Sequence, residues 1–175
     1  MRDADQLARF EQIVLPHLDD AYNLARWLTR QEQDANDVVQ EAFLRAYQFF
    51  DSFQGGSSRP WLLSIVRNTC YTWLQRNKAQ EPVASFDEEI HSGARTSVSP
   101  DAQSLAREER GLLRQAIEQL PPEFREAIVL RELEGLSYKE IAEIAGIPLG
   151  TVMSRLARAR EQLQHCLSDR LSEES

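Results

Sequence analysis

The sequence has few cysteines and histidines, and it lacks the arrangements of these residues that bind metals. The two cysteines, Cys70 and Cys166, lie far apart and form no CxxC pair, and the three histidines do not complete a cluster of zinc-site spacing. Paired carboxylates or His/Cys groups at a spacing useful for catalysis are also missing. We therefore expect no metal site, no cofactor and no catalytic residue, and we expect that the protein is not an enzyme.

Long apolar segments are also missing from the sequence. Because a transmembrane helix needs about 20 mostly apolar residues, we expect no membrane insertion. Residues 1–10 are charged and lack the apolar stretch and small-residue cleavage site of a secretory signal. Free cysteines are typical of a reducing compartment, so the sequence predicts a cytoplasmic protein.

The net charge of -8 argues against a general affinity for nucleic acid, but the basic residues are unevenly distributed. Residues 52–80 contain four basic residues and no acidic one, and residues 147–160 contain three arginines and no acidic residue. Two local basic patches in an acidic chain indicate two separate nucleic-acid contacts. Scattered arginines on solvated helix faces would give the same composition, so composition alone leaves both interpretations open.

Helical periodicity of apolar residues predicts an all-α protein of two small helical domains joined by a flexible linker. We place the first domain at residues 1–79, the linker at residues 80–101 and the second domain at residues 102–175. The linker is rich in Pro, Ser, Gly and acidic residues and has little periodicity. Within the first domain, glycines and serines in residues 51–60 mark a loop between helices.

The sharpest motif lies in residues 137–164 and is typical of a helix-turn-helix. Ser137 and Glu140 have the spacing of a capping box that begins a short support helix. Gly146 follows at the turn, where glycine adopts a left-handed backbone at low cost. The next helix carries polar residues at i, i+3, i+4 and i+7, which favours one outward face for reading bases; the alternative is a helical hairpin with a solvated arginine face. The predicted base readers are Thr151, Ser154, Arg155 and Arg158, and the predicted DNA-backbone contacts are Lys139 and Arg160.

Residues 61–78 form a predicted helix that combines polar amides, aromatic rings and cations. This combination suits single-stranded bases, because aromatic rings stack on bases and cations follow phosphates. The preceding loop could hold an extruded base. Helical aromatics are more often core residues, an alternative that we favour for Trp73 and leave open for Tyr71. The predicted contacts are Gly55, Gly56, Ser57, Ser58 and Arg59 in the loop and Arg67, Asn68 and Tyr71 on the helix.

A further predicted helix, over residues 34–50, is amphipathic in residues 37–47, where it carries an acidic face with one apolar side chain. That face consists of Asp37, Gln40, Glu41 and Leu44. Such a face could dock on a basic protein surface. From the chemistry alone, a plain solvated face is the favoured interpretation.

These pieces, in this order, resemble the extracytoplasmic-function (ECF) sigma factors of the sigma-70 family. The resemblance is carried by DANDVVQEAFLRAYQFFDSF at residues 34–53, PWLLSIVRNTCYTWLQRNK at residues 60–78, and LPPEFREAIVLRELEGLSYKEIAEIAGIPLGTVMSRLARARE at residues 120–161. It implies that the first domain is sigma region 2, that the second is sigma region 4, and that the protein gives RNA polymerase its promoter specificity. It also implies a stress or envelope response and control by an anti-sigma factor.

The resemblance also implies a role for each group of candidate residues. Asp37, Gln40, Glu41 and Leu44 would bind the clamp helices of the largest polymerase subunit, which replaces the solvated-face interpretation. The loop of residues 55–59, with Arg67, Asn68 and Tyr71, would melt and read the −10 element as single strands. Thr151, Ser154, Arg155 and Arg158 would read the duplex −35 element. The acidic linker would lie near the polymerase active centre and the RNA exit path.

Two other classes of function compete with this interpretation. A dimeric helix-turn-helix repressor or activator would bind palindromic duplex DNA without polymerase, but the chain has no obvious dimerising helix or ligand domain. An enzyme acting on nucleic acids would need the catalytic groups that the sequence lacks.

Overall fold

The structure, a computed structural model, describes residues 2–78 and 102–173, and these residues contain helices and turns but no strand. The all-α prediction is confirmed for this part of the chain, while the predicted linker, residues 80–101, lies outside the described residues. The helices are α1 (Arg2–Val14), α2 (Leu18–Thr29), α3 (Glu32–Gln48), α4 (Ser58–Lys78), α6 (Ala102–Glu118), α7 (Pro122–Ile128), α8 (Tyr138–Ala145) and α9 (Leu149–Glu173). Short turns at Leu15–His17, Phe50–Ser52 and Val129–Leu133 connect some of them.

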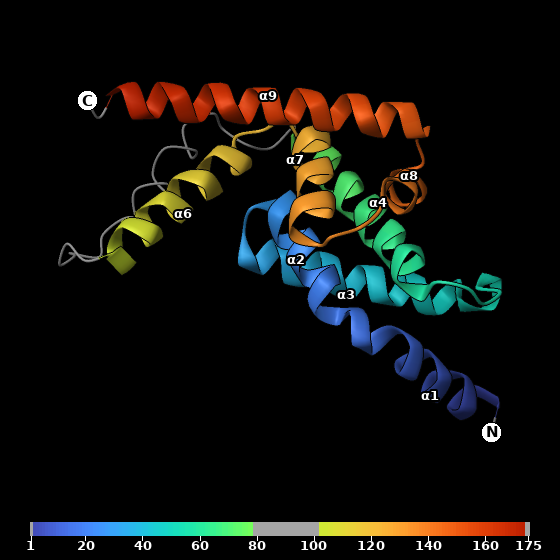
Figure 1. The fold of residues 1–175 in the computed structure, drawn as a ribbon. Helices are drawn as coiled ribbons and strands as arrows, with labels where there is room; N and C mark the ends of the chain where they lie inside the picture. Colours follow the sequence, from blue (N-terminus) through green and yellow to red (C-terminus); the bar gives the residue numbers. More distant parts are fainter. Residues whose placement is uncertain (1, 79–101, 174–175) are drawn as a thin grey trace.

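Helices α2, α3 and α4 pack against one another and form the centre of the first domain (Figure 1). Their facing surfaces bury Leu24 and Leu28 of α2, Val38 of α3, and Leu62 and Val66 of α4. These residues recur at helical spacing, and their burial from water supplies most of the stabilising free energy. Helix α1 extends away from this centre (Figure 1).

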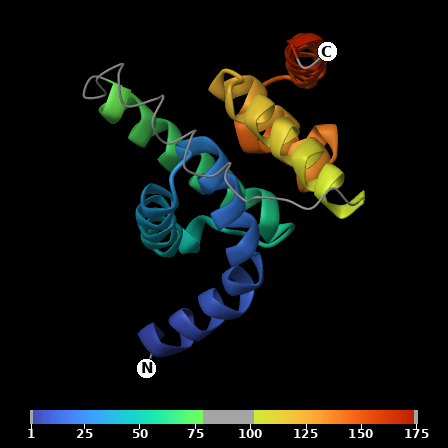
Figure 2. The same ribbon diagram turned by 90° about the vertical axis from the view of Figure 1, so that its left-hand side faces the viewer.

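The second domain is built from α7, α8 and α9, with α6 packed against α9. Leu130, Leu136, Ile141, Ile144 and Leu156 are almost completely buried in its centre. Figure 2 shows α6 and α9 on the opposite side of the molecule from α1. The packing of α8 against α9 is that of a helix-turn-helix unit, as the sequence predicted.

The two domains lie against each other through α4 and α8 and through α2 and α7. The buried apolar residues of both domains belong to one continuous cluster. Helix α4, which carries one set of candidate DNA contacts, therefore has a face covered by the second domain. Among the described residues, no helix is long and apolar enough to cross a membrane.

The support helix α8 begins and ends where local chemistry predicts. The backbone NH of Glu140 donates to Ser137 Oγ over 3.1 Å, and the backbone NH of Ser137 donates to Glu140 Oε1 over 3.0 Å. At the other end, Gly146 has a φ of +67° and its NH donates to the carbonyl of Ala142 over 2.9 Å. Both bonds of the predicted capping box and the predicted glycine turn are confirmed.

The apolar periodicity of the sequence predicts helices over residues 123–133 and 149–167, and both ends differ in the structure. Helix α9 was expected to end near Leu167 but continues to Glu173, and Arg170 near its end donates to Gln115 of α6 over 2.7 Å. This bond joins the extended part of α9 to α6. Helix α7 was expected to reach about Leu133, but the last five residues form a wider π turn, Val129–Leu133.

The turn before the recognition helix can be tested by substitution of Gly146. We expect Gly146→Ala to lower the free energy of unfolding by about 1 kcal/mol, because a β-carbon is strained at this left-handed backbone. A β-carbon at Gly146 would meet no atom within 4 Å, so the effect isolates backbone strain. Urea titration followed by circular dichroism measures the change. Gly150→Ala, inside α9 and equally free of contacts, should cause no loss; equal losses would contradict the prediction.

Candidate nucleic-acid interface

The loop before α4 presents two glycines with positive φ angles to solvent. Gly55 and Gly56 have φ values of +89° and +86°, which residues other than glycine rarely adopt. Both glycines and Ser57 are exposed, whereas Ser58 is half-buried and its hydroxyl lies 2.9 Å from Nε2 of His17. The open part of the predicted −10 loop is therefore residues 55–57.

The predicted −10 face of α4 is only partly open. Asn68 is exposed, while Arg67 and Tyr71 are half-buried. The guanidinium carbon of Arg67 lies 4.1 Å from the centre of the Tyr71 ring, a cation–π arrangement. The structure thus brings Arg67, Asn68 and Tyr71 together, with one of the three facing solvent.

Glu126 of α7 accepts hydrogen bonds from both of the covered side chains. Arg67 Nε donates to Glu126 Oε1 over 2.7 Å, and the Tyr71 hydroxyl donates to Oε2 over 2.9 Å. Burial raises the pKa of the Glu126 carboxyl, although the positive charge of Arg67 opposes the rise. Burial likewise raises the pKa of the Tyr71 phenol, so this group stays a hydrogen-bond donor. Glu126 is a functional candidate that the sequence reasoning missed.

Arg59, the last residue of the predicted −10 loop, bridges the two domains. Its Nε donates to Asp20 Oδ2 over 2.8 Å, and its Nη2 donates to Glu134 Oε2 over 3.1 Å and to the Glu134 carbonyl over 3.0 Å. Burial raises the pKa of the Glu134 carboxyl, and the nearby Asp20 carboxyl raises it further. Glu134 was not among the residues predicted from the sequence.

The recognition helix α9 presents Ser154 and Arg158 to solvent, with Thr151 half-exposed at their edge. Ser154 Oγ donates to the Gly150 carbonyl over 2.9 Å, which leaves its lone pairs outward. Met153 of the same helix has an exposed apolar side chain and was not among the predicted DNA contacts. Helical periodicity could have shown that Met153 lies outside the buried face of α9. Apolar side chains can contact the methyl group of thymine.

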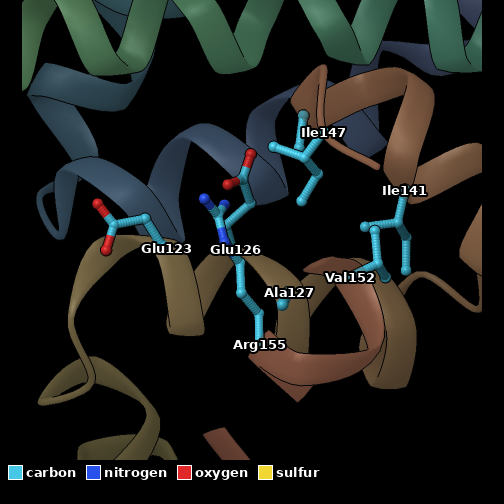
Figure 3. A pocket seen from close by; sticks show the side chains of 8 residues that line it. Glu123, Glu126, Ala127, Ile141, Ile147, Val152 and Arg155 are labelled. Carbon is cyan, nitrogen blue, oxygen red and sulfur yellow. The ribbon is translucent and has the colours of Figure 1, made fainter. Parts of the chain in front are cut away.

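Arg155 differs from the other predicted −35 residues. Its guanidinium is directed toward the Glu126 carboxylate, and the two residues line the same small pocket beneath Ile147 (Figure 3). Its Nη1 atom is buried. The sequence grouped Arg155 with the outward residues, but in the structure it lies half-buried at the edge of that face.

The predicted DNA-backbone residues lie on the outer surface of the second domain. Lys139 is exposed at the start of α8. Arg160 is also exposed and donates to Glu132 Oε1 over 2.8 Å. A surface ion pair of this kind contributes little stability, so Arg160 can exchange its partner for a phosphate at low cost.

The predicted polymerase-binding face on α3 is open to solvent. Asp37 and Gln40 are exposed, and the Leu44 side chain is 67% exposed. Glu41 forms an ion pair with Arg45 over 2.8 Å, one helical turn away. Phe49, directly after α3, is also an exposed apolar side chain, at 59%, and was not among the residues predicted from the sequence.

The remaining sequence expectations concern the cysteines and a metal site. Cys70 is buried in the first domain, and burial raises the pKa of its thiol well above the ordinary value. Such a thiol is protonated and poorly reactive. Within residues 2–78 and 102–173, no group of three or more His, Cys, Asp or Glu side chains is placed to hold a metal ion.

Fold and surfaces together define a two-domain helical protein with a helix-turn-helix in its second domain. The family model described as Sigma-70 region 2 matches residues 13–80, and that described as Sigma-70, region 4 matches residues 110–163. Both matches, together with the identity to ECF sigma factors given below, show that the chain belongs to the ECF sigma factors of the sigma-70 family.

Several relatives support this assignment. The ECF RNA polymerase sigma-E factor of Escherichia coli K12 is 42% identical over 139 residues, which cover 75% of this chain and 73% of that protein. The ECF RNA polymerase sigma factor SigE of Mycolicibacterium smegmatis is 34% identical over 173 residues, 98% of this chain. The chain spans 66% of the length of that relative.

Two solved structures share the fold. The sigma factor RpoE in complex with the anti-sigma factor NepR, from Bartonella quintana, superposes with a TM-score of 0.68 at 28% identity and covers 91% of this chain and 97% of that one. CnrH in complex with the cytosolic domain of CnrY gives a TM-score of 0.64 at 27% identity and covers 91% of this chain and 88% of that one.

Proposed function

We propose that the chain directs RNA polymerase to specific promoters as an ECF sigma factor and performs no catalysis itself. The observation that carries the proposal is the pairing of a region 2 match over α2–α4 with a region 4 match over the helix-turn-helix. This pairing supplies two DNA-reading surfaces on one chain. The domain bounds, residues 1–79 and 102–175, remain part of the proposal.

The division of labour follows from the three surfaces. The α3 face, with Leu44 and Glu41, would bind the clamp helices of the largest polymerase subunit. The α4 face and its loop would capture unstacked −10 bases, and the outward face of α9 would read the −35 duplex. Because polymerase holds both domains, two modest contacts act as one selective contact through their high effective concentration.

Control by an anti-sigma factor is also proposed. The structurally similar sigma factor RpoE was solved in complex with the anti-sigma factor NepR, and the structurally similar CnrH was solved in complex with the cytosolic domain of CnrY. A response to stress at the cell envelope and a location in the cytoplasm, where core polymerase acts, complete the proposal.

Transcription in vitro with core polymerase on a pool of randomised promoters tests the function. We expect transcripts to start downstream of two shared sequence elements at a fixed spacing, and only when the chain is present. If core polymerase gains no start site, while the chain alone binds palindromic duplex DNA, the dimeric helix-turn-helix alternative replaces the proposal.

A further inference from the structure

The exposed side of the recognition helix carries an apolar row that none of the proposed contacts uses. The row consists of Leu149, Met153 and Ala157, which recur every four residues along α9. Leu149 is 50% exposed and Met153 is 53% exposed. A single exposed apolar residue is common on protein surfaces, but two large ones in a regular row mark a contact surface.

The apolar row runs beside the polar row that is predicted to read bases. Ser154 and Arg158 are also four residues apart, and each follows a member of the apolar row by one position. Neighbouring positions on a helix are about 100° apart around its axis, so the two rows are adjacent. Both lie outside the buried face formed by Val152 and Leu156. A groove that receives Ser154 therefore also receives Met153.

The charges around the row favour a nucleic-acid groove over an apolar protein surface. Residues 147–160 carry three arginines and no acidic residue. Arg158 and Arg160 are exposed within two turns of Met153 on the same helix. An apolar protein partner would bury these guanidinium groups without an anion, at a cost in desolvation. The DNA major groove presents methyl groups between two lines of phosphates, so it matches both kinds of side chain.

Thymine is the base that an apolar side chain can select in this groove. It presents a C5-methyl group there, whereas the other three bases present only hydrogen-bonding groups. A methionine side chain has no donor and only a weakly accepting sulfur, and its flexible chain adapts to small apolar surfaces. Recognition helices contact base edges through their N-terminal residues, and Leu149 and Met153 lie in the first two turns of α9.

We propose that Met153 is a specificity-determining residue that selects thymine in the −35 element through its methyl group, with Leu149 extending the apolar contact toward the helix N-terminus. The inference rests on the proposed function for the identity of the element. The burial of one methyl group corresponds to about a fourfold change in affinity. Loss of that group should therefore have a measurable effect that leaves promoter recognition by the arginines in place.

Replacement of thymine by uracil tests the contact, because uracil pairs with adenine in the same way and lacks only the methyl group. Core polymerase with the full chain transcribes selected promoters in which each −35 thymine, on either strand, is replaced in turn. We expect at least one replacement to reduce transcription about fourfold. With Met153→Ala the thymine and uracil templates should give equal transcription, because the interaction partner is absent. Met153→Leu should keep most of the preference for thymine.

Leu171→Ala is the matched control. It truncates an apolar side chain that is 64% exposed near the other end of α9, and it should keep the full dependence on the methyl group. The comparison of thymine with uracil uses the wild-type chain, so its result does not depend on the folding of a variant. A −35 element without thymine, equal transcription of both templates by the wild type, or a methyl dependence that survives Met153→Ala would each overturn the contact.

Binding titrations separate this proposal from the sigma-factor function. Fluorescence anisotropy measures the affinity of the full chain alone for duplexes enriched from a random pool, with thymine or uracil at each position. A chain that directs no transcription, but binds a thymine duplex about fourfold more tightly through Met153, would reject the sigma-factor function and keep the methyl contact. Promoter-specific transcription without any dependence on the methyl group would reject only the contact.

Discussion

Glu41→Lys is expected to weaken binding to core polymerase about 30-fold or more and to reduce transcription from every promoter. The residue lies beside the exposed Leu44 on the α3 face, where an acidic surface would meet a basic one. Placing like charges together across an interface costs several kcal/mol, and each 1.4 kcal/mol is a tenfold change in affinity. The substitution would also remove the ion pair between Glu41 and Arg45.

Competition for labelled core polymerase measures this effect directly. Glu11→Lys, on the exposed surface of α1, is the matched control because it makes the same charge change elsewhere in the first domain. Glu41→Gln should fall between the wild type and Glu41→Lys. Equal affinities of the Glu11 and Glu41 variants would show that the α3 face is only a solvated surface, which was the interpretation from chemistry alone.

Arg158→Ala is expected to reduce transcription from promoters with an intact −35 element about tenfold to a hundredfold, while polymerase binding stays unchanged. Arg158 is exposed on the outward face of α9, and a bidentate arginine–guanine contact contributes about 1–3 kcal/mol of discrimination. Transcription from matched templates with and without the −35 element measures the change. The variant should reduce the difference between the two templates.

Arg160→Ala is the discriminating control on the same helix. Arg160 is held by Glu132 at the edge of the surface, so we expect it to contact phosphates and not bases. Its loss should weaken binding to all sequences to a similar extent and make binding less dependent on salt. If the Arg160 variant lost −35 selectivity and the Arg158 variant did not, Arg160 would be the base reader and Arg158 the phosphate contact.

Local chemistry made much of the fold predictable. The Ser137–Glu140 capping box and the left-handed Gly146 depend on interactions within a few residues, and both were found where the sequence placed them. The contact between Arg170, in the extended end of α9, and Gln115 of α6 was not predictable, because the two residues are 55 positions apart. Periodicity indicates which face of a helix is buried but not which distant helix covers it.

The candidate site was predictable in its residue types but not in its pairing. Arg67 and Tyr71 were expected to share a face, and they do. Their common partner, Glu126, lies in a helix that the sequence places outside both basic patches. A single sequence gives no signal for an ion pair across 59 positions. For the same reason, the inward direction of Arg155 became visible only once α7 and α9 were placed together (Figure 3).

The exposed apolar side chain of Leu44 has a consequence for the amount of protein that a cell can tolerate. It lies on the surface that polymerase would cover, so molecules made in excess of polymerase would leave it exposed to water. We expect overproduced chain to self-associate or to be degraded, and co-production with a binding partner to keep it in solution. Supply matched to the number of free polymerase molecules would thus be a requirement set by the protein surface itself.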